Sequence, residues 1–132
     1  MVSQNPNQDT WQDIQQATQK DIRALVVAPI YNHGRTLRTV VEGILAMHDA
    51  VLVVDDGSTD GGGQDILDLN VLILRHETNR GKGAAIRTAA KEAMARGYTH
   101  IITNDADGQH DPADISKFIR IIAEHPQAVV VG

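Results

Sequence analysis

The sequence predicts a three-layer α/β/α domain built around a mainly parallel sheet. Short apolar runs alternate with segments whose apolar residues recur at helical spacing, and this alternation is typical of βαβ units. Hydrophobic residues make up 42% of the 132 residues, whereas aromatic residues make up only 3%. The core must therefore rest on Val, Ile, Leu and Ala, a composition that suits parallel strands covered by helices. The length allows one domain of ordinary size.

Charge and composition exclude several classes of protein. The net charge of -5 argues against a nucleic-acid-binding protein, which would usually present a basic face. The absence of cysteine excludes disulfides and zinc–thiolate sites. No run approaches the roughly 20 apolar residues that span a membrane, and residues 1–8 lack the apolar stretch of a signal peptide. We therefore expect a cytoplasmic protein that has no membrane span in this chain and binds no nucleic acid.

The chain divides into an extension and a domain. We expect residues 1–20 to form an N-terminal extension, with a polar tail and a short helix over Thr10–Lys20, and residues 21–132 to form the domain. Five apolar runs are expected as strands: Ala24–Ile30, Val51–Val54, Val71–Leu74, His100–Thr103 and Val129–Val131. Right-handed crossovers place helices on both faces of such a sheet. We expect a Rossmann-like sheet with strand order around 3-2-1-4, in which the first strand is central.

Helical segments lie between these runs. Apolar residues recur at helical spacing from Leu37 to Leu45, a short helix is expected around Gln64–Leu69, and a last helix is expected to begin at Pro112. The Ala-rich segment Gly83–Arg96 predicts a further helix. Its expected buried face consists of Ile86, Ala89, Ala90, Ala93 and Met94.

Polar clusters follow three of the predicted strands, at the point where each strand ends. These clusters are Tyr31–His33, Asp55–Ser58 and Asp105–Gln109. The carboxyl ends of parallel strands lie on the same edge of a sheet, and open α/β sheets bind ligands there. If the first strand lies between the second and the fourth, the three clusters converge on one crevice.

Asp105 and Asp107 are the candidate metal ligands. Two carboxylates so close together repel each other unless a cation lies between them, and oxygen ligands of this kind suit Mg²⁺ or Mn²⁺. Gln109 offers a further amide oxygen. The alternative is a helix-capping loop with solvated acids. The position directly after a strand, beside Asn104, favours the metal site.

Two other segments carry polar groups for which both readings stay open. In Asp55–Asp60, one acid could accept a hydrogen bond from a base N–H or a ribose hydroxyl, or the segment could be a turn and helix cap. In Asn79–Gly83, two glycines and two cationic side chains precede a helix, an arrangement that suits a bound phosphate. The alternative is a glycine-rich start of a helix with solvated cations. Asn79–Gly83 is not a P-loop, since no Gly-Lys-Ser/Thr occurs there. His33, His76 and His110 are expected in loops near this edge, and none is assigned a catalytic role.

Four segments in order resemble a known family. They are Val26–Asn32, Val54–Asp60, Asn79–Ala85 and Asp105–His110. Together they resemble the family 2 glycosyltransferases of the GT-A fold, most nearly the dolichyl- and polyprenyl-phosphate sugar transferases. The resemblance covers about Arg23–Gly132, which is nearly everything after the N-terminal extension.

The resemblance implies a donor site for a UDP- or GDP-linked sugar and an inverting transfer to an acceptor, either a lipid phosphate or a glycan hydroxyl. The implied nucleotide-binding residues are Pro29, Tyr31, Asn32, Val54, Asp56, Lys82, Gly83 and Ala106. The implied ligands of Mg²⁺ or Mn²⁺ are Asp105, Asp107 and Gln109. Such an ion would neutralise the charge that develops on the leaving diphosphate.

Two departures from the family pattern qualify these expectations. His33 stands where the family usually has an acid. In these enzymes the acceptor site and the general base come from a second half, which would follow Gly132, so we expect this chain alone to be inactive in transfer. An uncovered sheet edge would also permit self-association.

Two other functions remain open. A non-enzymatic nucleotide-binding or regulatory module could keep the same architecture. A nucleotidyltransferase ranks last, because that class typically needs a basic glycine-rich loop after the first strand and Asn32–Arg35 offers a single glycine.

Overall fold

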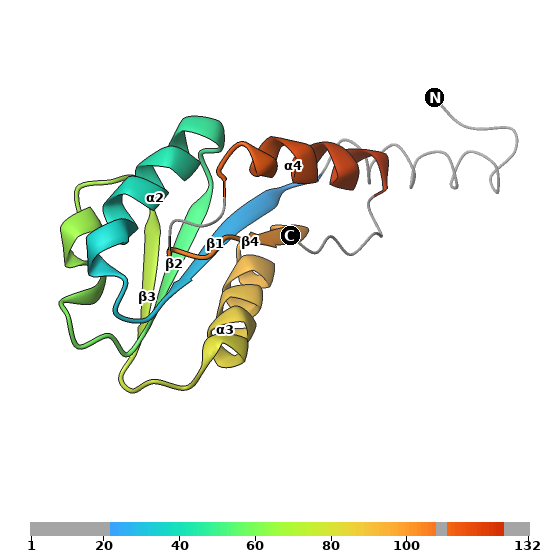
Figure 1. Ribbon diagram of the computed structural model, residues 1–132. Coiled ribbons are helices and arrows are strands. Elements are labelled where there is room, and N and C mark those ends of the chain that lie inside the picture. Colours follow the sequence, from blue (N-terminus) through green and yellow to red (C-terminus); the bar gives the residue numbers. More distant parts are fainter. Residues whose placement is uncertain (1–21, 108–110, 126–132) are drawn as a thin grey trace, which may run out of the picture.

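A single parallel sheet organises the protein. The computed structural model describes residues 22–107 and 111–125. The four strands within these ranges pair in the order β3-β2-β1-β4, with every neighbouring pair parallel (Figure 1). Their bounds are β1 (Ala24–Ile30), β2 (Val51–Asp56), β3 (Leu72–His76) and β4 (His100–Thr103). This order confirms the expected 3-2-1-4 arrangement with the first strand in a central position.

Helices cover both faces of the sheet and complete the three layers (Figure 1). They are α2 (Gly34–Met47), the short 3₁₀ helix η1 (Gly62–Ile66), α3 (Lys82–Ala95) and α4 (Asp114–Glu124). The helices α2, η1 and α4 pack on one face, and α3 packs on the other. The three-layer α/β/α prediction is therefore confirmed.

The core consists of two layers separated by the sheet. Successive side chains of a strand point to opposite faces, so Val26 and Val53 face α2 whereas Leu25 and Leu52 face α3. All residues of β1 and β2 are buried. Burial on both faces explains why these strands are almost continuously apolar in sequence.

The buried face of α3 differs from the expected one. The residues that pack on the sheet are Ala85, Ala89 and Ala93, whereas Met94 is 78% exposed. The buried stripe repeats every four residues and is made entirely of methyl side chains, whereas the larger Ile86 and Met94 favour a different face when only hydrophobicity is considered. Small side chains allow the helix to approach the strands closely.

Several element boundaries also differ from expectation. The strand β3 starts at Leu72 and extends to His76, and the short helix η1 lies earlier than Gln64–Leu69. The helix α4 begins after Pro112, because the side chain of Asp111 accepts a hydrogen bond from the backbone N–H of Ala113 at 2.9 Å and forms a turn there. The expected helix over Thr10–Lys20 and the expected strand over Val129–Val131 lie outside the described residues.

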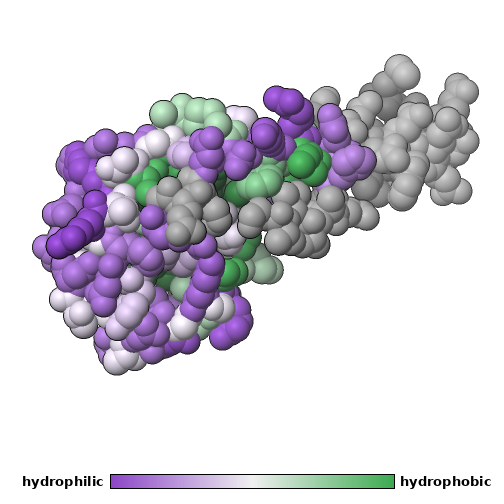
Figure 2. Space-filling view, in the orientation of Figure 1, coloured by the Kyte–Doolittle hydropathy of each residue, from purple (hydrophilic) through white to green (hydrophobic). Residues whose placement is uncertain are grey.

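The described surface is mainly polar. Figure 2 shows a largely hydrophilic face, on which hydrophobic residues form several small, separate groups. Ile121 of α4 is 38% exposed. Within residues 22–107 and 111–125, none of the helices combines the length and the apolar character that crossing a membrane requires.

The end of β2 anchors the loop that follows it. Asp55 faces the η1 side, where its carboxylate accepts hydrogen bonds from the Ser58 backbone N–H at 2.9 Å and from Arg75 at 3.2 Å. Asp55 is 1% exposed, so these donors compensate its burial. Gly62 lies against the same carboxylate with φ of +54°, a left-handed conformation.

We expect Gly62→Ala to destabilise the protein more than Gly61→Ala. A Cβ at Gly62 would overlap Oδ2 of Asp55, whereas a Cβ at Gly61 would meet nothing within 4 Å. Both positions have positive φ, so Gly61→Ala measures the backbone strain alone, about 1–2 kcal/mol. Gly62→Ala should cost roughly 2–4 kcal/mol because it also displaces a buried, hydrogen-bonded carboxylate. Urea unfolding measures both, and equal losses would contradict the steric explanation.

Two exposed acids make stability depend on acid pH. Hydrogen bonds from the backbone N–H groups of Gly62 and Gly34 lower the pKa of Asp60, and the hydrogen bond from Arg38 lowers the pKa of Asp68 to about 2. A carboxylate with a lowered folded-state pKa stabilises the fold above its unfolded pKa, and this contribution is lost as the pH falls through the folded pKa.

We therefore expect the free energy of unfolding to decrease as the pH falls from about 4 toward 2. Asp60→Asn should flatten this decrease, since the variant cannot be protonated at that position. Asp49→Asn, an exposed acid at the other end of the sheet, is the control for loss of one negative charge. Urea unfolding across this pH range checks the expectation, and an unchanged acid slope in Asp60→Asn would contradict it.

Candidate functional site

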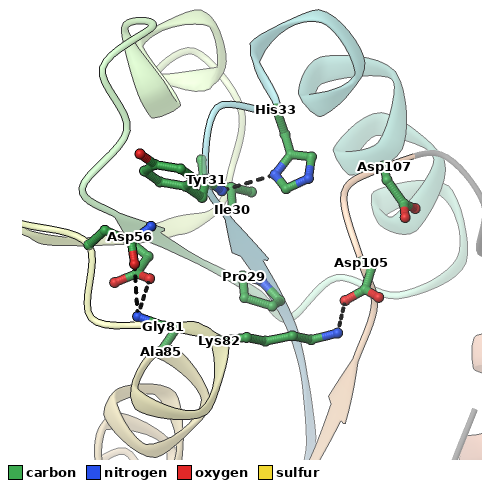
Figure 3. Close-up of a pocket in the computed structure, with 11 residues that line it drawn as sticks. Pro29, Ile30, Tyr31, His33, Asp56, Gly81, Lys82, Ala85, Asp105 and Asp107 are labelled. Atoms are coloured by element: carbon green, nitrogen blue, oxygen red, sulfur yellow. Dashed lines mark hydrogen bonds and ion pairs between the residues drawn. The ribbon is translucent and has the colours of Figure 1, made fainter.

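A pocket of about 260 Å³ opens where the carboxyl ends of the central strands meet the start of α3. The strand-end residues that the sequence places on one edge do converge here. The lining residues come from the end of β1, from all three polar clusters, and from the loop before α3 and its first turn (Figure 3): Pro29, Ile30, Tyr31, His33, Asp56, Asn79, Gly81, Lys82, Ala85, Asp105 and Asp107.

Hydrogen bonds join the loop after β1 to the loop after β2. The backbone N–H of Asn32 donates to the Ser58 hydroxyl at 3.0 Å, and the Asn32 side-chain oxygen accepts from the Thr59 backbone N–H at 2.8 Å. Asn32 has φ of +57°, a left-handed conformation that Asn tolerates better than most residues. Its side chain therefore fixes the loop and does not line the pocket.

Tyr31 and His33 form the wall of the pocket at the end of β1. The backbone N–H of Tyr31 donates to Nδ1 of His33 at 2.9 Å, so this nitrogen is the acceptor and Nε2 carries the proton. The Tyr31 side chain is 43% exposed. An aromatic ring left open to solvent at a pocket can stack on a planar ligand.

Asp56 faces the α3 side and holds the loop that leads into that helix. Its Oδ1 accepts hydrogen bonds from His76 at 2.7 Å and from the Arg80 backbone N–H at 2.9 Å, and its Oδ2 accepts from the Gly81 backbone N–H at 2.8 Å. Burial raises the pKa of this carboxyl, but the hydrogen bonds from His76, Arg80 and Gly81 outweigh burial and leave the pKa below its ordinary value. Asp56 is thus a carboxylate that shapes the pocket floor.

The buried residue His76 is the part of this network that the sequence analysis missed. It is the last residue of β3 rather than a loop residue, it pairs directly with Asp56 in the β2–β3 register, and it is 6% exposed. Its Nδ1 donates to Asp56, because a carboxylate only accepts, and its Nε2 lies 2.8 Å from the Thr88 hydroxyl of α3. Strand alternation extended two residues beyond Leu74 would have placed His76 beside Asp56.

The opposite end of the pocket is acidic. Asp105 and Asp107 both line it from the segment after β4. Lys82, the first residue of α3, reaches across the pocket and forms an ion pair with Asp105 at 2.6 Å (Figure 3). Lys82 is the only Lys or Arg among the described residues that line the pocket.

These two carboxylates are the groups that could hold a divalent cation. No group of three or more His, Asp or Glu residues arranged to bind a metal occurs in residues 22–107 and 111–125, and Gln109 lies outside these ranges. Mg²⁺ is usually held by one or two carboxylates together with phosphate oxygens and water. The two carboxylates therefore fit a divalent cation whose remaining ligands come from a phosphate and from water.

Three other expected nucleotide-binding residues lie elsewhere. Val54 is completely buried in the core against α3, and Ala106 is completely buried against the other face. The backbone carbonyl of Ala106 accepts a hydrogen bond from the Thr36 hydroxyl. Gly83 is exposed in the first turn of α3, outside the pocket lining. Proximity in sequence to pocket residues does not bring these side chains into the pocket.

Comparison with known proteins identifies the family. The model of "Glycosyl transferase family 2" matches residues 25–132. The chain is 32% identical over 125 residues to a UDP-N-acetylglucosamine–dolichyl-phosphate N-acetylglucosaminyltransferase of Methanococcus voltae, covering 81% of this chain and 50% of that protein. It is 34% identical over 108 residues to a polyprenol monophosphomannose synthase of Mycolicibacterium smegmatis, covering 74% of this chain and 40% of that protein.

A solved structure supports the fold. The crystal structure of S. aureus TarS 1-349 superposes with a TM-score of 0.63 at 24% sequence identity, covering 84% of this chain and 38% of that one. The chain spans half or less of the length of each of these proteins. The family model covers residues 25–132, well over half of the chain, and the chain belongs to glycosyl transferase family 2.

Proposed function

We propose that the chain is the donor-binding part of a glycosyltransferase, and that its pocket holds a nucleotide-diphosphate sugar together with a divalent cation for inverting transfer. The observation that carries this proposal is the division of one pocket into two ends. Tyr31 and Asp56 lie at one end, and Asp105 and Asp107 lie at the other, with Lys82 between them (Figure 3).

The first end suits the nucleoside. The exposed ring of Tyr31 and the apolar ring of Pro29 offer surfaces for a planar base. Each carboxylate oxygen has room for two hydrogen bonds. Oδ2 of Asp56 accepts the Gly81 N–H and can accept a second donor, such as a base N–H or a ribose hydroxyl. The loop contacts of Asp56 would hold this acceptor rigid.

The second end suits a diphosphate with a cation. Asp105 and Asp107 outnumber Lys82 in charge, so a diphosphate alone would enter an acidic site and be repelled. A bound Mg²⁺ or Mn²⁺ would reverse the local field and would stabilise the negative charge of the leaving diphosphate. The two carboxylates would hold the ion, and Lys82 would place one more positive charge beside the phosphates.

The acceptor side is proposed from the relatives. The matched proteins from Methanococcus voltae and Mycolicibacterium smegmatis are named for dolichyl phosphate and for polyprenol, which supports a polyprenyl-type lipid phosphate as acceptor. They are at least twice as long as the matched part. We assign the acceptor site and the general base to the portion of such proteins that this chain does not cover.

Asp107→Ala should abolish the metal-dependent part of nucleotide binding. Losing one ligand with a charge-assisted contact should weaken binding of UDP or GDP by roughly 10-fold or more. Calorimetric titration of each nucleotide, in Mn²⁺ and in chelator, measures the effect. Asp49→Ala removes the same charge from an exposed position at the far end of the sheet and should bind as the wild type does.

The control conditions separate the alternatives. Equal nucleotide affinity in Mn²⁺ and in chelator would reject the cation. Slow Mn²⁺-dependent hydrolysis of a nucleotide sugar would support the enzyme over a non-enzymatic binding module.

His76 should act as a positioning residue for Asp56. His76→Ala removes a buried donor and should cost about 1–3 kcal/mol of stability, and it should also weaken nucleotide binding because Asp56 and the 79–82 loop lose a fixed position. His76→Asn keeps an N–H near the position of Nδ1 and should restore nucleotide affinity more than stability. Urea unfolding and nucleotide titration measure the two effects, with the exposed His125→Ala as control. Equal nucleotide affinity in His76→Ala and the wild type would contradict this role.

A further inference from the structure

The ion pair between Lys82 and Asp105 places a protein cation on a proposed metal ligand. The two residues come from different elements, since Lys82 begins α3 and Asp105 follows β4. Their side chains meet across the pocket with Nζ 2.6 Å from Oδ1 (Figure 3). The pair therefore occupies the same space that a divalent cation and its phosphate ligands would need.

A divalent cation that binds Asp105 would compete with Lys82 for the same carboxylate. The ammonium group already uses one oxygen of that carboxylate, and two cations on one acid repel each other. Lysine differs from arginine in carrying a compact charge on a flexible four-carbon chain. Its side chain can therefore swing away from the carboxylate while the backbone of α3 stays fixed.

The exposure of the pair favours such a movement. The side chain of Lys82 is 58% exposed and that of Asp105 is 29% exposed, and ion pairs open to solvent contribute little stability. A diphosphate in the pocket would offer Lys82 several charged oxygens, and phosphate contacts of this kind are strong. In this exchange Lys82 would give up one weak, partly exposed contact and gain several charge-assisted ones.

We propose that Lys82 is an exchangeable cation that couples nucleotide binding to metal binding. Without nucleotide, Lys82 pairs with Asp105 and competes with the divalent cation. With nucleotide, Lys82 moves to the diphosphate and releases Asp105 to the cation. Because linkage is reciprocal, the cation must raise nucleotide affinity by the same factor. This inference rests on the proposed function of the pocket.

The test compares Mn²⁺ binding in the wild type and in Lys82→Met without nucleotide. Removing the competitor should tighten Mn²⁺ binding about 2- to 5-fold, because an exposed ion pair is worth up to about that factor in an equilibrium constant. Calorimetry and the electron paramagnetic resonance signal of free Mn²⁺ measure the affinity of the full chain. Lys91→Met removes the same charge from an exposed position on α3 outside the pocket and should leave Mn²⁺ affinity unchanged.

The second arm measures the coupling itself. UDP or GDP at saturation should tighten Mn²⁺ binding by a larger factor in the wild type and in Lys91→Met than in Lys82→Met, where only direct contacts between metal and phosphate remain. Lys82→Arg keeps the charge and should stay close to the wild type in the first arm. Circular dichroism confirms that every variant is folded.

The outcomes separate this inference from the proposed function. Unchanged or weaker Mn²⁺ binding by Lys82→Met, or a coupling factor equal to that of the wild type, would overturn the exchange while nucleotide binding stands. Failure of the wild type to bind either nucleotide in the presence of Mn²⁺ would overturn the proposed function, and the exchange with it.

Discussion

The parallel pairing of β1 between β2 and β4 is the constraint from which the site follows. Val26 pairs with Val51 on one side, and Ala24 pairs with His100 on the other. These pairings bring the carboxyl ends of three strands to one edge, where each chain segment leaves the sheet and is free to carry polar groups. The apolar strands and the acidic pocket are therefore two results of the same topology.

At the end of β2, the alternation of side chains gives two neighbouring residues different roles. Asp55 and Asp56 are adjacent in sequence, but alternation sends them to opposite faces. Asp55 fixes the loop that leads to η1 through Ser58, and Asp56 fixes the loop that leads to α3 through Gly81. The two adjacent acids thus fix two different loops, one after β2 and one before α3.

The sequence predicted the strand order, the layers and six residues that line the pocket. Those residues share a clear signal, since each lies near the end of an apolar run or at the start of a helix: Pro29, Tyr31, Asp56, Lys82, Asp105 and Asp107. Asn32 instead ties two loops together, and Val54 and Ala106 are buried. Their roles depend on which way a side chain points at the end of a strand, and a change of one residue in register reverses that direction.

The predictions for His76 and for the buried face of α3 were wrong for related reasons. A histidine after a short apolar run is typical of a surface loop, and the burial of His76 follows only once the strand is extended two residues to the pairing with Asp56. In α3 the apolar residues Ile86 and Met94 suggested one face, whereas packing selected the alanines. Close packing against a sheet favours small side chains, a preference that hydrophobicity alone does not record.

The buried alanine stripe of α3 also influences where the ammonium group of Lys82 lies in the pocket. Ala85, Ala89 and Ala93 place only methyl groups of the helix against the strands, which allows the helix to pack close to the sheet. Lys82 lies one turn before the first of these alanines. A larger residue in the stripe would act as a spacer and shift that ammonium group outward. Substitutions in this hydrophobic layer would therefore move Lys82 relative to Asp105 without altering either residue.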